Sequence, residues 1–547
     1  MPDATSAAPQ ETDVVIVGAG FAGMYLLHRL RNAGIRTRVF ETATGVGGTW
    51  YWNRYPGARC DVESMQYSYS FLPELEQEWN WSELFSAQPE ILRYANHVAD
   101  RLDLRRDIQF ETKVTDATYD EAAHRWTVRT DRGDVVSCRY FVMATGCLSA
   151  ARKPDFKGAD SFKGPTYHTG HWPHEGVDFT GKVVGVIGTG SSAIQAIPVI
   201  AEQAKELYVF QRTPNFSIPS RNVKMTDGYA RSWKDVYPER REEARQTRNG
   251  VLANPNDISA MAVDEAERQR MYEERWKSGG TTFMAVFNDL IFSKESNDTA
   301  SEFVRNKIRS IVKDPRTAEL LAPKDHPIGT KRICVDTNYY QTYNRPNVHL
   351  VDVHSAPIEE ITPDGLRTGG VEYKLDAIVY ATGFDAMTGA LTSVAIRGRG
   401  GETLKDKWEA GPRTYLGLMT AGFPNMFMIT GPGSPSVLSN MMVSIEQHVD
   451  WITDCLVNLG QRQMDCIEAT QAAEDAWVEH VNQVAYTTLY PSAASWYMGA
   501  NIEGKPRVFM PYIGGVGRYR QECDEIVAKG YEGFVIQGPV RRAEAAE

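Results

Sequence analysis

The stretch Asp13-Val-Val-Ile-Val-Gly18-Ala-Gly20-Phe-Ala-Gly23 decides the fold of the first part of the chain. An apolar run leads into spaced glycines, and an apolar-periodic segment follows through Leu30. This order predicts a strand, a tight turn and a helix. A second apolar run ends at Phe40 and is followed by Glu41. The whole segment therefore has the length of one βαβ unit, about 30 residues.

The glycines of this first motif have distinct tasks in a dinucleotide site. Gly18 permits the tight turn, Gly20 lets the backbone approach a diphosphate, and Gly23 lets the helix pack on the strand. The diphosphate then lies at the N-terminus of the helix, where free N–H groups favour negative charge. Glu41, about 20 residues further on, is expected to accept hydrogen bonds from a ribose.

The same pattern recurs in a second motif. Residues 182–187 form an apolar run that enters Gly188-Thr-Gly190-Ser191-Ser-Ala193, and a helix and a strand are expected to follow. After that strand, Arg212 and Thr213 stand where an acidic residue would indicate NAD. The guanidinium of Arg212 can bind a 2′-phosphate with two hydrogen bonds, which favours NADPH. The alternative is that Arg212 is a solvated charge at the end of a strand.

Two further apolar strands, 140–146 and 377–383, both end in Ala-Thr-Gly, and we interpret them as places where the chain passes between two domains. Residues 225–323 are rich in Glu, Arg, Lys, Ala and Met with few β-branched runs, which predicts a helical insertion. Two dinucleotide sites in one chain suggest that electrons pass from NADPH to FAD.

Composition narrows the function further. The chain has 547 residues, of which 42% are hydrophobic, and no apolar run approaches the roughly 18 residues of a membrane span. Its net charge of −11 argues against nucleic acid as a partner. Seven scattered cysteines without a CxxC spacing predict neither a structural metal site nor a redox disulfide. The polar start, 1–13, predicts no secretory signal, so we expect a cytoplasmic enzyme.

Two longer stretches resemble fingerprints of the Baeyer–Villiger monooxygenases, which are flavoproteins. The first is Gly47-Gly-Thr-Trp50-Tyr-Trp-Asn-Arg-Tyr55-Pro56-Gly57-Ala-Arg-Cys-Asp61. The second, Phe162-Lys-Gly164-Pro-Thr-Tyr-His168-Thr-Gly-His-Trp172-Pro173, matches FxGxxxHxxxWP at every position. Related amine- and sulfide-oxidising flavin monooxygenases usually lack the Trp-Pro ending. The resemblance covers nearly the whole chain and looks closest to the phenylacetone and steroid monooxygenase group.

The resemblance implies an α/β fold of two Rossmann-like dinucleotide-binding domains, with a helical subdomain inserted in the second. The FAD-binding domain is expected at 1–146 and 385–547, the NADP-binding domain at 147–384, and the helical insertion at 220–330. It also implies the reaction: NADPH reduces FAD, a C4a-peroxyflavin forms with O2, and a ketone becomes an ester or lactone. Aryl, cyclic or steroid-like ketones are the expected substrates, with sulfoxidation as a side activity and no obligate protein partner.

By this resemblance, Arg332 is the cation that stabilises the reacting oxygen anion, because guanidinium keeps its proton at working pH. Asp61 is expected to orient Arg332 and the nicotinamide, Lys331 to help Arg212 hold the 2′-phosphate, and Trp496 to touch NADP. Further cofactor-binding residues are expected in the first motif and fingerprint (Gly18, Gly20, Gly23, Glu41, Gly48, Trp50, Tyr55) and in the second motif (Gly188, Gly190, Ser191, Ala193, Thr213). The residues expected to line the substrate are Ser436, Val437, Leu438 and Met441.

Other interpretations stay open at this stage. An adjacent Lys-Arg pair is usually a solvated surface pair, and Met441, Trp50 and Trp52 fit plain core positions. His168 lies in a linker between the domains, and we interpret it as structural rather than catalytic. The competing functions are an N- or S-oxygenating flavin monooxygenase and a non-catalytic FAD-binding protein or redox sensor.

Overall fold

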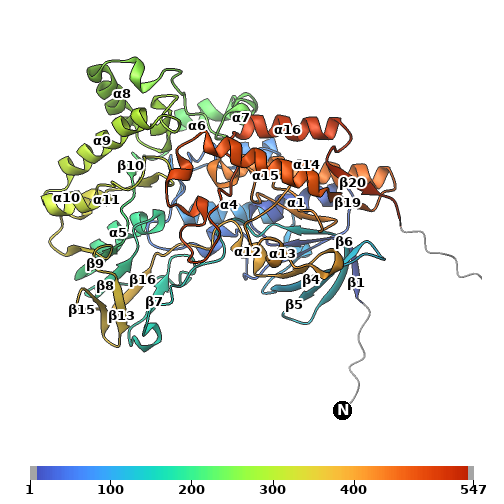
Figure 1. Cartoon of the computed structure of the whole chain (residues 1–547), viewed down its shortest axis with the longest axis horizontal. Coiled ribbons are helices and arrows are strands. Elements are labelled where there is room, and N and C mark those ends of the chain that lie inside the picture. Colours follow the sequence, from blue (N-terminus) through green and yellow to red (C-terminus); the bar gives the residue numbers. More distant parts are fainter. Residues whose placement is uncertain (1–8, 540–547) are drawn as a thin grey trace, which may run out of the picture.

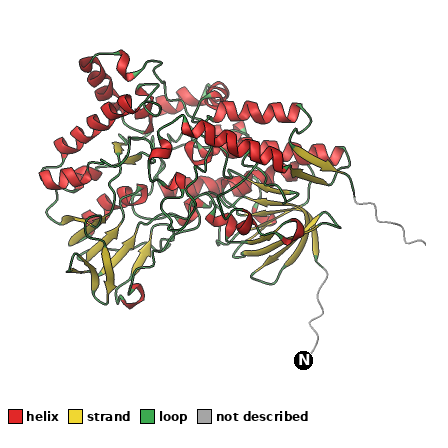
Figure 2. Cartoon of the chain, viewed as in Figure 1, coloured by secondary structure: helices red, strands yellow, loops and turns green. Residues whose placement is uncertain are grey.

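The computed structural model describes residues 9–539, so most of the polar start from which the cytoplasmic location was inferred lies outside the described residues. The two largest β-sheets occupy opposite sides of the molecule, and helices cover both (Figure 1). Helices and loops fill the region between the sheets (Figure 2). Within the described residues, no helix is both long enough and apolar enough to cross a membrane.

The first sheet has eight strands and is built around the first βαβ unit. Val14, Val15 and Ile16 are fully buried on its central strand β1, since an apolar run without alternation suits a strand covered on both faces. β1 pairs in parallel with β2 and β6, whereas β4, β5 and β6 form an antiparallel meander. The strands are β1 (Gln10–Val17), β2 (Thr37–Phe40), β3 (Ile108–Gln109), β4 (Val114–Asp120), β5 (Arg125–Thr130), β6 (Val135–Met143), β17 (Ala395–Arg397) and β18 (Met426–Met428).

Helices from both ends of the chain pack together on this sheet. The helix of the first motif, α1 (Phe21–Asn32), contacts the long apolar helix α14 (Met441–Gln461), and both contribute to one core. The other helices of this half are α2 (Thr49–Trp52), α3 (Pro73–Glu78), α4 (Gln88–Arg101), α12 (Gly389–Thr392), α13 (Leu404–Lys407), α15 (Gln471–Tyr486) and α16 (Val516–Ala528). An antiparallel pair of strands, β19 (Cys466–Ala469) and β20 (Phe534–Gln537), lies at the ends of these helices (Figure 1).

The second sheet is fully parallel and contains the second βαβ unit. Its strand order is β12 (Val348–Asp352), β9 (Glu206–Gln211), β8 (Val183–Ile187), β16 (Ala377–Tyr380) and β7 (Thr166–His168). The helix α5 (Ser191–Gln203) joins β8 to β9, as the sequence predicts. A small antiparallel sheet, β13 (Ile358–Thr362), β14 (Gly365–Thr368) and β15 (Val371–Lys374), precedes β16.

The chain moves between the sheets at the two places that the sequence indicates. It leaves the first sheet after β6 and enters the second at β7. It returns after β16 and re-enters the first sheet at β17. The predicted α/β class with two dinucleotide-binding βαβ units is therefore confirmed.

The helical insertion does not pack as one unit. It lies between two short parallel strands, β10 (Ser217–Pro219) and β11 (Cys334–Asp336). Trp233 and Tyr237, on its first two helices, belong to the core of the first sheet, whereas Tyr272 and Phe303 belong to the core of the second. The helices are α6 (Asp227–Lys234), α7 (Tyr237–Gln246), α8 (Glu265–Ser278), α9 (Lys294–Ile311), α10 (Pro315–Leu321) and the short α11 (Tyr339–Thr342), which follows β11.

Candidate functional site

The first glycine motif is packed so closely that side chains would not fit. Gly18 has a φ of +104°, and a Cβ at Gly23 would lie 1.9 Å from the carbonyl oxygen of Gly18. A Cβ at Gly48 would lie 2.9 Å from the Cα of Gly20, so the first fingerprint touches the motif directly. Gly20 thus has a second task that its spacing does not reveal, the close approach of another loop.

Glu41 lies at the end of β2 and is almost fully buried. Its Oε2 accepts a hydrogen bond from the Ala19 N–H at 2.6 Å, and its Oε1 accepts one from the Ala43 N–H at 2.8 Å. Burial raises the pKa of the Glu41 carboxyl, and these N–H groups oppose that shift. Each carboxylate oxygen can accept a further hydrogen bond, so the expected contact with a ribose is compatible with this arrangement.

The second motif is packed in the same way, with one open position. Gly188 has a φ of +112°, and a Cβ there would lie 2.5 Å from the carbonyl oxygen of Ala381. A Cβ at Gly190 would meet nothing within 4 Å, because this glycine faces open space at the start of α5. Ala193 is fully buried and packs in the core of the second sheet.

Arg212 and Thr213, which stand where the 2′-phosphate is expected to bind, directly follow β9. The Thr213 carbonyl accepts a hydrogen bond from the Thr189 hydroxyl at 2.8 Å, which ties the strand end to the glycine loop. Lys331 forms an ion pair with Asp325 at 3.7 Å. Burial lowers the pKa of Lys331, Asp325 opposes the shift, and the charge of Arg212 adds to it. Arg212 lines the cavity, whereas Lys331 lies outside its lining, paired with Asp325.

The proposed cation and its carboxylate meet between the two sheets. Arg332 Nη2 and Nε donate to Oδ2 of Asp61 at 3.1 and 3.3 Å, while Nη1 only approaches the Val437 carbonyl at 3.5 Å. Burial raises the pKa of Asp61, and Arg332 opposes this. Burial also lowers the pKa of Arg332, but Asp61 more than offsets it and holds the pKa above its usual range. Arg332 is thus a permanent cation, with 37% of its side chain exposed.

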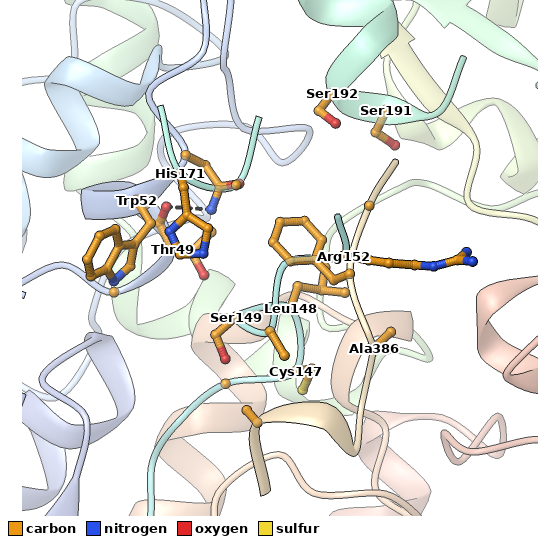
Figure 3. A pocket seen from close by; sticks show the side chains of 18 of the residues that line it. Thr49, Trp52, Cys147, Leu148, Ser149, Arg152, His171, Ser191, Ser192 and Ala386 are labelled. Atoms are coloured by element: carbon orange, nitrogen blue, oxygen red, sulfur yellow. Dashed lines mark hydrogen bonds between the residues drawn. The ribbon is translucent and has the colours of Figure 1, made fainter. Parts of the chain in front are cut away.

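One cavity of about 1080 Å³ joins both glycine motifs to this ion pair. Figure 3 shows Thr49 and Trp52 of the first fingerprint, Ser191 and Ser192 of the second motif, and Cys147 with Leu148 around the same opening. The expected site residues that line the cavity are Gly18, Gly20, Glu41, Gly48, Trp50, Tyr55, Asp61, Gly188, Gly190, Ser191, Arg212, Thr213, Arg332, Val437, Met441 and Trp496. Gly23, Ala193, Lys331, Ser436 and Leu438 lie outside the lining.

Ser436 and Leu438, which are expected to line the substrate, lie behind the cavity lining because of how their loop turns. The loop forms a single 3-10 turn, Ser436–Leu438, ahead of α14. Ser436 is fully buried, and its hydroxyl lies 2.9 Å from the Cys147 thiol and donates to the Thr430 carbonyl at 3.1 Å. Val437 and Met441 face the cavity instead. The direction of each side chain in a loop depends on the backbone turns. The sequence alone therefore could not show that Val437 and Met441 face the cavity while Ser436 and Leu438 do not.

Comparisons with known proteins agree with this geometry. A family model described as pyridine nucleotide-disulphide oxidoreductase matches residues 15–228. A Baeyer-Villiger monooxygenase of Pseudooceanicola batsensis is 44% identical over 97% of this chain and 97% of its own. A solved structure of oxidized steroid monooxygenase bound to NADP is 57% identical, with a TM-score of 0.92, and covers 96% of this chain and 100% of its own. The chain belongs to the Baeyer–Villiger monooxygenases.

The predicted family is thereby confirmed, and its neighbours add two points. All seven cysteines of this Baeyer–Villiger monooxygenase are free. The relatives also include a phenazine N-monooxygenase of Lysobacter antibioticus, 43% identical over 96% of this chain and 97% of its own. Two relatives with nearly the same identity to this chain are therefore named for different reactions, one for Baeyer–Villiger oxidation and one for N-oxidation.

His168 of the monooxygenase fingerprint contacts the backbone at the crossing between the sheets. Its Nδ1 accepts the Gly170 N–H at 2.9 Å, so the ring proton is on Nε2 and is donated to the Arg152 carbonyl at 3.0 Å. Burial lowers the pKa of His168. Both nitrogens are occupied and the residue does not line the cavity, which favours the structural interpretation.

Sequence reasoning missed several lining residues. Cys147 directly follows the strand-ending glycine of the first crossing, and that position was the available signal. Arg152 also lines the cavity, and its guanidinium donates to the Asn501 carbonyl. Asn501 lines the cavity as well, and its Oδ1 is buried without a partner among the residues that the structure describes. No sequence pattern marks Arg152, whereas Asn501 ends the stretch 495–501, which resembles a segment near substrate and nicotinamide in the phenylacetone and steroid monooxygenase group.

Proposed function

We propose that this Baeyer–Villiger monooxygenase binds FAD at the first glycine motif and NADPH at the second, and oxidises ketones that carry a ring system. Aryl, cyclic and steroid-like ketones are the substrate class, and esters or lactones are the products. The observation that carries the proposal is the position of Arg332. It is a permanent cation held by Asp61 in the cavity that reaches both glycine motifs.

The residues present fit both cofactors. Gly190 leaves open space at the N-terminus of α5, where a diphosphate can approach backbone N–H groups. Arg212 and Thr213 line the cavity at the end of the adjoining strand, where a 2′-phosphate is read. The unpartnered Oδ1 of Asn501 offers an acceptor to an N–H or hydroxyl group of a cofactor. We propose that Gly18, Gly20, Gly48, Trp50 and Glu41 hold FAD.

The reaction consumes one ketone, one O2, one NADPH and one proton, and yields one ester or lactone, one water and one NADP⁺. The flavin, when bound, takes hydride from NADPH and activates O2. Arg332, which lines the cavity as a permanent cation, then stabilises the negative charge on the oxygen that attacks the carbonyl. Asp61 fixes the plane of the guanidinium through two hydrogen bonds to Nε and Nη2.

The substrate class rests on the apolar wall near Arg332. Leu148, Val437, Met441 and Ile445 line the cavity together with Val62. These side chains give apolar contact and no directional hydrogen bond, which suits a hydrocarbon ring beside a single carbonyl. The 57% identity to a steroid monooxygenase supports the same class. We propose that sulfides of similar shape are oxidised as a side activity.

The second candidate function is N-oxidation of an aromatic heterocycle, and the phenazine N-monooxygenase relative favours it. An aromatic amine fits the same apolar wall, but its nitrogen is a nucleophile and has no carbonyl for an oxygen anion to attack. A neutral or protonated oxidant is needed in that case, and Arg332 would not be required. The dependence on Arg332 therefore separates the two functions.

The sheets suggest how the functions divide along the chain. We propose the FAD-binding domain at 1–146 and 385–547 and the NADP-binding domain at 147–384, supported by the strand membership of the two sheets. The insertion at 220–330 belongs to the second domain in sequence, although α6 and α7 share the core of the first. We also propose a cytoplasmic enzyme without an obligate protein partner; the free cysteines support the cytoplasmic location.

The deciding experiment is product analysis by the purified enzyme with NADPH. Phenylacetone, cyclohexanone, a ketosteroid, an aryl sulfide and phenazine are each supplied, and the products are identified by mass spectrometry. An ester or lactone one oxygen heavier than its ketone supports the proposal. N-oxide from phenazine without any ester replaces it by the second candidate, and bound flavin without NADPH consumption contradicts both.

A further inference from the structure

Gln195 connects the helix of the second motif to the first fingerprint. It lies in the first turns of α5, and its amide makes contacts in both directions. The oxygen Oε1 accepts the Tyr55 hydroxyl at 2.8 Å and the Arg59 N–H at 3.3 Å. The nitrogen Nε2 donates to the Arg59 carbonyl at 3.1 Å and to Oδ1 of Asp61 at 3.4 Å. All these partners are more than 130 residues away in sequence.

Asp61 is therefore held from two sides. Its Oδ2 accepts from Arg332, and its Oδ1 accepts from Gln195. A carboxylate held at one oxygen can still turn about its Cβ–Cγ bond, because this terminal torsion is broad, whereas one held at both oxygens has a fixed plane. The plane of Asp61 in turn sets where the guanidinium of Arg332 points. No other side chain reaches Oδ1 of Asp61 by a hydrogen bond among residues 9–539.

The backbone beside Gln195 is built for this contact. Gly57 has a φ of +82°, and a Cβ there would lie 2.3 Å from the Gln195 carbonyl oxygen. The fingerprint thus approaches α5 as closely as a glycine allows. Gln195 follows Ser191, the first residue of α5, by four positions, which is about 6 Å along the helix axis. Any shift of α5 on binding a diphosphate is passed to Asp61 within about one turn.

We propose that Gln195 is a positioning residue that aligns Asp61, and through it Arg332, with the helix that binds NADPH. The inference rests on the role proposed above for Arg332. Gln195 touches no reacting atom in this scheme, and it is absent from the lining of the cavity. Its task is to make the position of the cation depend on the position of the NADPH helix.

The first test is Gln195→Leu, with Gln203→Leu as the matched control. Gln203 lies at the other end of α5, where its side chain only accepts the Phe179 N–H at 3.2 Å. Three quantities are measured on the holoenzyme: the Tm, the Kd for NADP⁺ by flavin absorbance, and the ester formed per NADPH consumed. We expect the ester formed per NADPH consumed to fall about 10-fold in Gln195→Leu, roughly 1.4 kcal/mol. Hydrogen peroxide should replace the missing ester.

A positioning role and a merely structural one differ in their effect on the Kd for NADP⁺ and on bound FAD. We expect the Kd for NADP⁺ to change by less than about twofold in Gln195→Leu, because Gln195 does not line the cavity in which NADPH is proposed to bind. The control Gln203→Leu should keep the wild-type ester yield. A loss of ester that is matched by an equal weakening of NADP⁺ binding, or by loss of bound FAD, overturns the proposal.

The second test is Gln195→Glu, which keeps the size and stays informative if the leucine variant fails to fold. The introduced carboxylate, when ionised, repels Asp61, whose Oδ1 lies 3.4 Å from Nε2 of Gln195 in the native enzyme. Once protonated, the new side chain is neutral and can again donate one hydrogen bond. The ester yield of this variant relative to the native enzyme should therefore rise as the pH falls. A ratio that is independent of pH overturns the proposal.

Arg332→Ala distinguishes a failure of the positioning role of Gln195 from a failure of the role proposed for Arg332. If Arg332→Ala loses ester formation but Gln195→Leu keeps the native yield, the positioning role is wrong and the role of Arg332 stands. If Arg332→Ala itself retains the native ester yield, the proposed function of the cation is wrong, and with it the basis of this inference. Ester loss in both variants, with NADP⁺ binding retained in Gln195→Leu, supports both.

Discussion

Arg332 Nη2 lies 3.1 Å from Asp61 Oδ2, although the two residues are 271 positions apart in the chain. Asp61 closes a loop next to the first sheet, whereas Arg332 precedes β11 beyond the helical insertion. Asp61 is almost fully buried and Arg332 is partly buried, so removing either one leaves its partner without compensation. A substitution at either Asp61 or Arg332 therefore tests both halves of the site at once.

Replacing Arg332 by Ala should abolish ester formation and leave FAD bound. Among the described residues the side chain of Arg332 makes no hydrogen bond to the first glycine motif, so that motif keeps its contacts, while the attacking oxygen loses its cation. We expect ester formation to fall at least about 100-fold, as for the loss of one preorganised charge donor. Arg332→Lys keeps the charge but not the fork that meets Asp61, and should lie between the two. Chromatography of the ester and a flavin absorbance spectrum check this; a near-native rate in Arg332→Ala contradicts it.

Replacing Arg212 by Ala should weaken NADPH much more than NADH. The guanidinium lines the cavity at the end of β9, and only NADPH carries a phosphate for it. A hydrogen bond to a charged group contributes about 1.5–3 kcal/mol, so the KM for NADPH should rise roughly 10- to 150-fold. Steady-state kinetics with both coenzymes measure the ratio. Arg316→Ala, on the exposed start of α10, is the control, and an equal change for NADPH and NADH would remove Arg212 from this role.

The parts of the site that could be predicted are those that local backbone geometry fixes. Gly18 and Gly188 both adopt positive φ values at the turns that their spacing predicts. Gln195, in contrast, looks like any polar residue in an amphipathic helix, and its four contacts come from residues that are distant in sequence. The same holds for Gly48 against Gly20, where the need for glycine arises from tertiary contact and not from a turn. Sequence patterns carry local constraints well and such cross-chain contacts poorly.

Gly23→Ala should impair folding and FAD loading, whereas Gly190→Ala should affect only the binding of NADPH. A Cβ at Gly23 would lie 1.9 Å from the Gly18 carbonyl oxygen, so either the helix or the loop must move. Overpacking of this kind costs about 1–3 kcal/mol or more, and we expect little FAD-loaded protein. A Cβ at Gly190 meets nothing within 4 Å, so Gly190→Ala should fold normally but bind NADPH more weakly. FAD content and the Tm test the first variant, and the Kd for NADP⁺ tests the second. Native FAD content in Gly23→Ala would contradict the packing argument.

His448 should make the enzyme less stable as the pH falls from neutrality. The residue is fully buried on α14, where Nδ1 accepts the Thr430 N–H at 2.9 Å and Nε2 lies 2.9 Å from the Tyr519 hydroxyl. Burial lowers the pKa of His448 from 6.5 to about 3, so the folded protein keeps it neutral. The unfolded chain takes up a proton below about pH 6.5, and the folded one does not. The contribution of His448 to the free energy of unfolding is therefore fully present above about pH 6.5 and decreases below it.

The expected loss from His448 is roughly 2 kcal/mol between about pH 6.5 and pH 5, since one pH unit corresponds to about 1.4 kcal/mol per proton. The apparent Tm, followed by scanning calorimetry across this range, measures it. His448→Asn keeps an acceptor for the Thr430 N–H but cannot be protonated, so its Tm should depend less on pH than that of the native enzyme. His354→Asn, at an exposed position after β12, should retain the native dependence. Equal pH profiles for His448→Asn and the native enzyme would show that another group is responsible.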